Sequence, residues 1–256
     1  MTLSHSQLGE IAQNNTIILT NVNCGYSDFA LNWAFALMAV GHHNFLCIVE
    51  DRPGFAYLAE VLPLKHLVMS PFMHETTGVA EWNTPRFIKY TISRPLYIKA
   101  VLAHGFRVLW TDIDSVLRKT PEPLLPDGFD LVLTDNRGGM ASYGSSNYCS
   151  CFLYFKPVPN SIMFLEDWHS ALQVSHVNED QNDFNVVLRR WRLKQNLSVL
   201  VLPSELFANG HVLTVWHADY VVWLHANYRV GKAQKRSYLE YTKSWHIPNN
   251  TNLLCS

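Results

Sequence analysis

The chain has 256 residues, of which 48% are hydrophobic and 16% are charged, and its formal net charge is −1. This length provides a substantial core in one large α/β domain or two small ones. The low charge and the aromatic content of 12% exclude disorder for most of the chain, and the near-neutral balance argues against a broad nucleic-acid interface. No apolar run approaches the roughly 20 residues of a bilayer span, so we expect no membrane span in this chain.

Strand and helix patterns alternate from Thr16 onward. Apolar, β-branched runs predict strands over residues 16–20, 45–49, 106–110, 130–133, 152–155, 199–202 and 221–225. Helical patterns cover residues 28–40, 55–62, 86–104, 162–174, 180–191 and 232–241. Pro95 should kink the long third helix or divide it in two. Turn residues predict a turn over residues 52–54 and a loop over residues 136–150.

This alternation predicts an α/β fold with a mostly parallel sheet and helices on both faces. In such folds, ligands bind at the carboxyl ends of the strands. Residues 1–15 are polar and lack the basic and apolar regions of a signal peptide, so we expect a flexible N-terminal segment there. A single domain should follow from residue 16 to residue 256.

Two aspartates follow the apolar run that ends at Trp110. Asp112 and Asp114 are one residue apart, at the predicted carboxyl end of a strand. Two carboxylates in this position can share a hard divalent cation such as Mg²⁺ or Mn²⁺, which commonly bridges them to substrate phosphates. A solvated turn with a capping aspartate is the structural alternative.

A second group of polar residues follows the last predicted strand. His225 ends that strand, and Asn227, Gly231, Lys232 and Lys235 come next. A histidine at a strand end can complete a metal site, and a nearby lysine can bind a diphosphate as a point charge. A structural histidine with two solvated lysines is the alternative.

A third polar cluster opens the helix expected from Asp180. Asp180, Gln181 and Asp183 follow Glu179 here. Such residues are favoured in the first turn of any helix, so a functional role requires that this helix end faces the metal. Five cysteines leave at least one thiol outside an intramolecular disulfide, and their pairing stays open.

Taken in order, these motifs resemble those of the nucleotide-diphospho-sugar transferase family, which includes plant and algal rhamnogalacturonan xylosyltransferases. The resemblance rests on VLWTDIDSV at 108–116, on Asp180-Gln181 with Asn185, on HANY at 225–228 with Gly231 and Lys235, and on TNVNCGY at 20–26. It implies a GT-A fold, which is a Rossmann-like nucleotide-binding sandwich. It also implies transfer of a sugar with retention, from a nucleotide diphosphate donor such as UDP-xylose or UDP-galactose, to a hydroxyl of a glycan or glycoprotein.

The resemblance also implies residue roles. A Mn²⁺ or Mg²⁺ ion would be held by Asp112, Asp114 and His225. Lys235, with Lys232 nearby, would meet the diphosphate. Further donor contacts are expected from Thr20, Asn21, Asn23, Tyr26, Asp112, Ile113, Asn227 and Gly231. Catalysis at the donor sugar would involve Asp180, Gln181 and Asp183.

The order of events at the anomeric carbon stays open at this level. Asp180 or Asp183 could act as a carboxylate nucleophile. Alternatively, the Gln181 amide could stabilise a cationic centre during same-face attack, with a phosphate oxygen accepting the proton. The resemblance implies a location in the Golgi lumen, as the soluble catalytic domain of a type II membrane protein, because members of this family are usually found there. A cytoplasmic location is also compatible with the sequence.

Two other functions fit parts of the sequence. In a haloacid dehalogenase-like phosphatase, Asp112 would be the nucleophile and Asp114 the acid, with Glu179 and Asp180 as distal Mg²⁺ carboxylates. That fold commonly opens with its signature, whereas Asp112 lies mid-chain, and the reading leaves His225 and Lys235 without a role. A sugar-nucleotide-binding protein without turnover is the non-enzyme alternative. The released product distinguishes the three functions: UDP for the transferase, inorganic phosphate for the phosphatase and no product for the binding protein.

Overall fold

The computed structural model describes residues 3–72, 78–79, 84–136, 147–175, 180–194, 196–210, 219–247 and 255, with backbone alone at 85 and 86. The strands are β1 (Thr16–Val22), β2 (Phe45–Val49), β3 (Leu67–Met69), β4 (Arg107–Thr111), β5 (Ser115–Leu117), β6 (Leu131–Asp135), β7 (Tyr148–Phe155), β8 (Val199–Leu202), β9 (Phe207–Ala208) and β10 (Trp223–His225). The α-helices are α1 (His5–Ile11), α2 (Ser27–Ala39), α3 (Arg52–Ala59), α4 (Pro85–Ile92), α5 (Arg94–Leu102), α6 (Pro159–Val174), α7 (Asp180–Leu193) and α8 (Lys232–Tyr241). Short 3-10 helices are η1 (Cys24–Tyr26), η2 (Leu64–His66) and η3 (Glu122–Leu124).

The main sheet has seven strands in the order β3-β2-β1-β4-β7-β6-β8. β1 runs parallel to β2 and β4, β2 runs parallel to β3, and β6 runs parallel to β8. β7 is antiparallel to both of its neighbours, β4 and β6. Every residue of β2 is buried, as expected for a strand that is covered on both faces.

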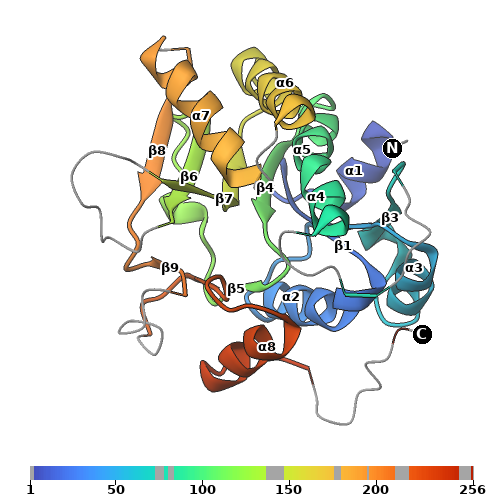
Figure 1. The fold of residues 1–256 in the computed structure, drawn as a ribbon. Helices are drawn as coiled ribbons and strands as arrows, with labels where there is room; N and C mark the ends of the chain where they lie inside the picture. The colour runs from blue at the N-terminus through green and yellow to red at the C-terminus, as the bar shows by residue number, and fades with distance from the viewer. Residues whose placement is uncertain are drawn as a thin grey trace.

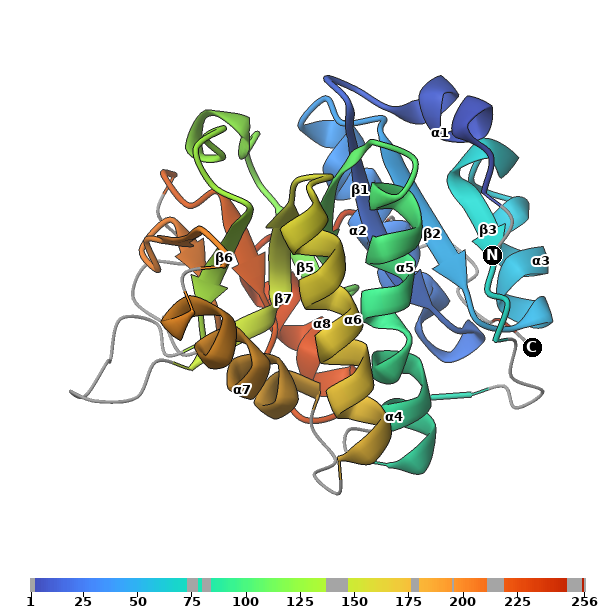
Figure 2. The same cartoon turned by 90° about the horizontal axis from the view of Figure 1, so that it is seen from above.

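Helices cover both faces of this sheet (Figure 1). α1, α5, α6 and α7 pack on one face in one hydrophobic cluster, and α2 and α3 pack on the other in a second cluster. Figure 2 shows α4 to α7 in front of the sheet and α2 and α8 behind it. The mostly parallel α/β sheet with helices on both faces, which the sequence predicts, is confirmed.

A second, three-stranded sheet joins distant segments, in the order β5-β10-β9. β10 is antiparallel to β5, with His225 opposite Ser115, and parallel to β9. Val116 and Leu224 of this sheet share a hydrophobic cluster with Phe29 of α2 and Leu239 of α8. The small sheet therefore brings the end of β10 next to the turn that follows β4.

Local signals explain several helix ends. Asp51 caps α3 by accepting the backbone N–H of Gly54 (2.8 Å), with proline in the first turn. The long helix is divided at Ser93, between α4 and α5, as Pro95 predicts. Gly105 adopts a φ of 85°, which ends the segment after α5 at low backbone cost.

Some elements differ from the sequence expectations. Residues 52–54 begin α3 instead of forming a turn, because Asp51 supplies a cap and Pro53 fits a first helical turn. The expected flexible segment contains α1, which buries Leu8 and Ile11. β7 begins at Tyr148, earlier than expected, while residues 137–146 of the predicted loop lie outside the described residues. β3, β5 and β9, which have two or three residues each, were not predicted.

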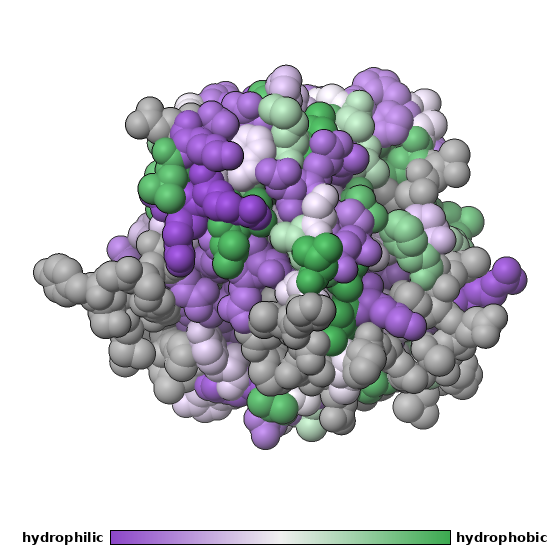
Figure 3. Space-filling model, turned by 45° about the horizontal axis from the view of Figure 1, so that its top comes forward, coloured by the Kyte–Doolittle hydropathy of each residue, from purple (hydrophilic) through white to green (hydrophobic). Residues whose placement is uncertain are grey.

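The outer surface carries no large apolar band on the face drawn in Figure 3, where hydrophobic residues form small patches among hydrophilic ones. Exposed large hydrophobic residues come from different elements, for example Leu64, Val174 and Tyr241. Scattered exposure of this kind is ordinary. None of the described helices is both long and apolar enough to cross a membrane.

Candidate active site

Asp112 and Asp114 follow β4 directly, at the carboxyl edge of the main sheet. The backbone N–H of Asp112 donates to the carbonyl oxygen of Cys151 on β7 (3.0 Å). The Ser115 hydroxyl donates to the Asp112 carbonyl oxygen (2.6 Å) and closes a tight turn. The Trp110 indole donates to Asp112 Oδ1 (3.1 Å). The two carboxylates therefore lie on a well-anchored turn, at the strand end where the sequence placed them.

His225 reaches the same turn from the small sheet. The backbone N–H of Ala226 donates to the Asp114 carbonyl oxygen (3.0 Å), which fixes the strand end beside the turn. His225 Nε2 lies 3.1 Å from Asp114 Oδ1 and 3.9 Å from Asp112 Oδ2. One ligand atom from each of these three residues lies within 4.8 Å of the others. Two carboxylates and an imidazole form a donor set that fits a divalent cation.

Lys235 approaches Asp114 from α8. Gly231 precedes this helix with a φ of 80°, which glycine adopts without strain. The Lys235 ammonium donates a hydrogen bond to Asp114 Oδ2. Burial opposes ionisation of Asp114, but Lys235 and His225 outweigh it and hold the pKa of the carboxyl well below its ordinary range. Asp114 is therefore an ionised carboxylate that is almost excluded from solvent.

Arg94 connects the turn to α7, a link that the sequence analysis missed. Its guanidinium pairs with Asp112 Oδ1 (3.0 Å) and Asp180 Oδ2 (2.9 Å), and it donates to the Ser150 carbonyl oxygen (2.8 Å). Burial lowers the pKa of Arg94, but the carboxylates around it outweigh this effect and raise it. Arginine can hold two carboxylates at once because its donors form a rigid fork.

The first turn of α7 only partly joins this cluster. Burial raises the pKa of Asp180, and the Arg94 guanidinium opposes that shift. Gln181 Nε2 donates to Asn147 Oδ1 (3.4 Å). Among the described residues Asp183 forms no ion pair, and its Oδ2 atom is buried without a hydrogen-bond partner. The structure therefore connects Asp180, but not Asp183, to the carboxylates after β4; Glu179 lies outside the described residues.

The end of β1 contains two of the residues that were expected to contact the nucleotide-sugar donor, Thr20 and Asn21. Thr20 is fully buried, and its Oγ1 has no hydrogen-bond partner among the described residues. Asn21 Nδ2 donates to Glu50 Oε1 (2.7 Å) and to the Tyr90 carbonyl oxygen (3.2 Å). Both side chains are therefore parts of the sheet interior and its edge.

A second lysine of α8, Lys232, lies near the loop after β1. Asn23 Nδ2 donates to the Gly78 carbonyl oxygen (2.7 Å). The Lys232 ammonium lies 5.9 Å from the centre of the Tyr26 ring and pairs with Asp28 at 2.8 Å. Lys232 thus lies near the predicted nucleotide loop, but its charge is paired with the buried Asp28 rather than with the carboxylates after β4.

Asn227 and Ile113 are the remaining residues that were expected to contact the nucleotide-sugar donor. Asn227 Oδ1 accepts the backbone N–H of Gly210 (2.6 Å), and its Nδ2 donates to Asn136 Oδ1 (3.3 Å). A Cβ on Gly210 would lie 2.0 Å from the Asn227 carbonyl oxygen, so the close approach requires glycine. Ile113 packs against the hydrophobic clusters beneath the turn.

A buried acid, Glu50, lies beside Asn21. Glu50 follows β2, and both of its carboxyl oxygens accept from the Tyr97 hydroxyl (2.9 and 3.0 Å). Burial raises the pKa of Glu50 to about 7, although hydrogen bonds from Asn21, Ser70 and Tyr97 oppose the shift. The sequence gives no sign of this pair, because the two residues are far apart along the chain.

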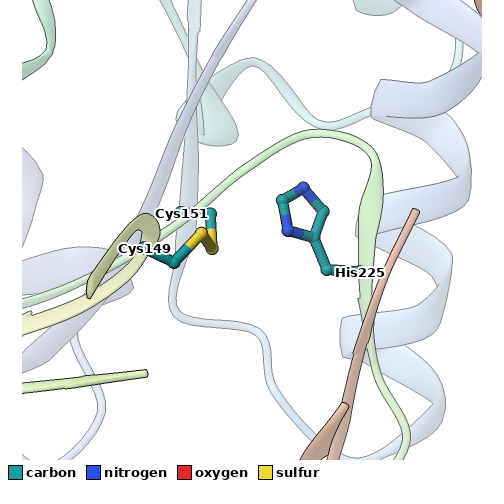
Figure 4. Close-up of side chains that lie close together, drawn as sticks. All are labelled: Cys149, Cys151 and His225. Atoms are coloured by element: carbon teal, nitrogen blue, oxygen red, sulfur yellow. A yellow bond between two sulfur atoms is a disulfide. The ribbon is translucent and has the colours of Figure 1, made fainter. Parts of the chain in front are cut away.

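The described cysteines form two disulfides, Cys24–Cys255 and Cys149–Cys151, and Cys47 is a buried free thiol. Burial raises the pKa of Cys47 to about 12. Cys149, Cys151 and His225 also bring their ligating atoms within 4.8 Å of one another (Figure 4). The sequence left this pairing open.

A family model described as nucleotide-diphospho-sugar transferase matches residues 40–239, which is most of the chain. The chain belongs to this family. The transferase is 27% identical over 239 residues to Arabinosyltransferase XEG113 of Arabidopsis thaliana, covering 83% of this chain but 36% of that relative. It is 23% identical over 265 residues to UDP-D-xylose:L-fucose alpha-1,3-D-xylosyltransferase 1 of the same plant, covering 94% of this chain and 73% of the relative.

Solved structures show the same fold. The galactosyltransferase LgtC, in complex with donor and acceptor sugar analogues, matches with a TM-score of 0.56 at 15% identity, over 91% of this transferase and 97% of LgtC. The glycosyltransferase GlyE of Streptococcus pneumoniae TIGR4 matches with a TM-score of 0.59 at 12% identity, over 88% of this transferase and 59% of GlyE. The fold is therefore GT-A, as the sequence resemblance implies, and the protein is a nucleotide-sugar glycosyltransferase by family.

Proposed function

We propose that this transferase moves a sugar from a nucleoside diphosphate donor to a glycan or glycoprotein hydroxyl, with a divalent ion held by Asp112, Asp114 and His225. The convergence of these three side chains from β4 and β10 is the observation that carries the proposal. When bound, the ion would supply positive charge next to the diphosphate oxygens of the leaving group. Mn²⁺ and Mg²⁺ both suit this donor set.

The charges of the cluster support an anionic leaving group. Three carboxylates, of Asp112, Asp114 and Asp180, surround two cations, Arg94 and Lys235, which leaves one net negative charge when all are ionised. A divalent cation changes that balance to one net positive charge. Such a site favours a diphosphate, whose negative charge grows as the bond to the sugar breaks.

Lys235 is the residue we assign to the leaving diphosphate. Its ammonium already reaches the metal-binding turn through Asp114, so a phosphate oxygen bound there lies within reach of the same side chain. Lys232, Tyr26, Asn23, Asn21 and Thr20 frame the loop after β1, where we place the nucleoside. Ile113, Asn227 and Gly231 form the wall between the position of the diphosphate and that of the nucleoside.

We propose retention by same-face attack. The Asp180 carboxylate accepts from Arg94 (2.9 Å) and from the Ser150 hydroxyl (3.1 Å), so it is held as a positioning group rather than as a free nucleophile. Asp183 forms no ion pair among the described residues and is not connected to the cluster. Gln181 then faces the cationic sugar, and a leaving phosphate oxygen accepts the proton of the acceptor hydroxyl.

We propose a UDP-pentose as donor. The two plant relatives are named as an arabinosyltransferase and as a transferase that uses UDP-D-xylose, which supports a pentose over a hexose such as galactose. We also place the domain in the Golgi lumen, as part of a type II membrane protein. The Cys24–Cys255 disulfide supports an oxidising compartment, since disulfides persist there and are rare in the cytosol.

The test is a donor-hydrolysis screen. The protein is mixed with Mn²⁺ and a panel of UDP- and GDP-sugars, and released nucleoside diphosphate is measured for wild type, Asp114→Asn and the surface control Asp127→Asn. Release from one donor, lost in Asp114→Asn and kept in Asp127→Asn, supports the transferase and names the sugar. Inorganic phosphate as product would indicate the phosphatase alternative. The proposal is contradicted if the protein releases no product from any donor and also does not bind UDP with Mn²⁺.

A further inference from the structure

His225 lies between two groups of ligating atoms. On one side, its Nε2 is 3.1 Å from Asp114 Oδ1. On the other side are Cys149 and Cys151, whose sulfur atoms lie within 4.8 Å of each other and of a ring nitrogen. Figure 4 shows the imidazole facing the two sulfurs across a short gap. All three residues are at most 4% exposed.

The hydrogen bond to Asp114 determines which ring nitrogen can bind a metal. An ionised carboxylate only accepts, so Nε2 carries the hydrogen and a neutral ring keeps its lone pair on Nδ1. Nδ1 is buried without a hydrogen-bond partner among the described residues. A histidine that donates one N–H to a carboxylate while its other nitrogen is bare has the arrangement typical of zinc ligands.

The backbone of β7 brings the two sulfurs together. Residues i and i+2 of a regular strand are about 6.6 Å apart. The Cα atoms of Cys149 and Cys151 are only 5.1 Å apart, next to a register shift in the pairing of β6 with β7. Such bulges re-aim side chains, often beside active sites. The disulfide spans a sequence separation of only 2, so it constrains the unfolded chain little.

We propose that the reduced thiols of Cys149 and Cys151, together with His225 Nδ1, form a second metal site for a thiolate-preferring cation such as Zn²⁺. A dithiol reductant opens the bond by supplying two electrons and two protons, and it becomes a disulfide itself. Each cysteine then loses its proton to solvent as the metal binds. Thiolates favour Zn²⁺ over Mg²⁺ or Mn²⁺, and three protein ligands leave a fourth position for water.

The two metal sites cannot both use a neutral His225. One lone pair is available, on Nδ1 toward the sulfurs or on Nε2 toward the carboxylates. Occupation of the sulfur site therefore removes a ligand from the ion at Asp112 and Asp114. This consequence rests on the proposed function, whereas the sulfur site itself does not.

The experiment uses Co²⁺ alone as the probe, with the whole chain. The protein is reduced with a phosphine, its free thiols are counted by alkylation and mass spectrometry, and Co²⁺ is added in the absence of air. We expect a thiolate-to-cobalt charge-transfer band in reduced wild type and in Cys47→Ser, lost in Cys149→Ser and in Cys151→Ser, and displaced by Zn²⁺. Unreduced wild type should give no band, which provides a control that needs no variant.

A second readout separates the two proposals. Mn²⁺ binding is followed by electron paramagnetic resonance in oxidised and in reduced protein without Zn²⁺, and in reduced protein loaded with one equivalent of Zn²⁺. Reduced, Zn²⁺-loaded protein should bind Mn²⁺ at least about tenfold more weakly, the loss typical of a disturbed metal shell. A disulfide that resists the phosphine, or free thiols that give no band, overturns the sulfur site. A band with no Mn²⁺ binding in either form contradicts the proposed function instead.

Discussion

The Asp114 carboxylate lies between a lysine ammonium and a histidine ring, and its side chain is 8% exposed. Asp114→Asn keeps the shape of the side chain but removes the charge. We expect activity to fall at least 100-fold, since a ligand and an electrostatic contact are both lost (roughly 10–1,000-fold per such group). Loss of the buried charge pairing should cost about 3 kcal/mol of stability, yet leave the protein folded at 25 °C. Donor hydrolysis and circular dichroism measure the two effects.

The matched control is Asp127→Asn. Asp127 also pairs with a cation, Arg107 (2.7 Å), but its side chain is 73% exposed. Exposed pairs contribute little, so both activity and stability should stay near wild type. Full activity in Asp114→Asn would remove this carboxylate from the proposed mechanism.

Arg94 is the second residue whose role depends on the chemistry of its own side chain. Arg94→Lys keeps the positive charge, but one ammonium cannot hold Asp112, Asp180 and Ser150 in the geometry of the guanidinium fork. We expect activity to fall about 10- to 100-fold, as when a group that orients metal ligands is lost. Arg107→Lys makes the same chemical change at a surface pair and should have no effect. Equal kcat/KM in Arg94→Lys and wild type would show that the fork is dispensable.

Glu50 predicts a pH dependence of stability. Its folded-state pKa of about 7 lies above the ordinary 4.5, so the folded state binds the extra proton between these values. Wild type therefore loses stability relative to Glu50→Gln as pH rises from about 4.5 to 7, by about 3 kcal/mol in all, and the difference is constant at higher pH. Urea unfolding of both proteins from pH 5 to pH 8 measures it. Curves that stay parallel would mean that Glu50 ionises normally.

At the scale of single elements, prediction succeeded where one strong local signal was present. The strand over residues 199–202 and the helix over residues 232–241 match their expected bounds. The apolar run of β2 was recognised because a strand buried on both faces has no polar alternation. The short strands β5 and β9 were missed, since they exist only through pairing with β10. Such pairing is a tertiary property that no local pattern contains.

The entry into α8 can be tested by a matched pair of glycines. Gly231 precedes α8 at a φ of 80°, and Gly41 follows α2 at a φ of 87°. A Cβ would meet no atom within 4 Å at either site, so alanine imposes only a backbone cost, on the order of 1–3 kcal/mol. Both variants should lose stability, and Gly231→Ala at least as much as Gly41→Ala, because the ψ of Gly231 is 155°. Only Gly231→Ala should weaken binding of UDP with Mn²⁺, by about tenfold (1.4 kcal/mol), because it displaces Lys232 and Lys235.

Isothermal titration of UDP with Mn²⁺ and thermal unfolding measure the two effects separately. Equal nucleotide affinity in both variants would show that the backbone before α8 does not position the lysines. Weakened binding in Gly41→Ala as well would indicate a general loss of order rather than a local effect.

At the scale of the whole molecule, the site depends on contacts between segments that are far apart in sequence. The family resemblance of the ordered motifs was enough to group Asp112, Asp114, His225 and Lys235, although His225 comes from the small sheet and Lys235 from α8. It could not show that Arg94 joins the cluster from α5, since a buried arginine has no local signature. It also could not show that Cys149 and Cys151 face His225, because that contact needs both sheets in place.

The Cys24–Cys255 disulfide ties the end of the chain to the loop after β1, across a sequence separation of 231 residues. In the chain-entropy model, such a long loop stabilises by roughly 5 kcal/mol, whereas the three-residue loop of Cys149–Cys151 contributes about 1.6 kcal/mol. We therefore expect Cys24→Ser/Cys255→Ser to lower Tm by about 10 °C or more, and Cys149→Ser/Cys151→Ser to lower it by only a few degrees.

Differential scanning calorimetry of the two double variants without reductant measures this contrast, since each removes one disulfide and the same number of sulfur atoms. Cys24 lies in η1, next to the residues assigned to the nucleoside, so the long-range variant should also bind UDP more weakly. Equal Tm losses in the two variants would contradict the chain-entropy argument. A larger loss from the short loop would mean that the sulfurs beside His225 are required for the packing of the two sheets.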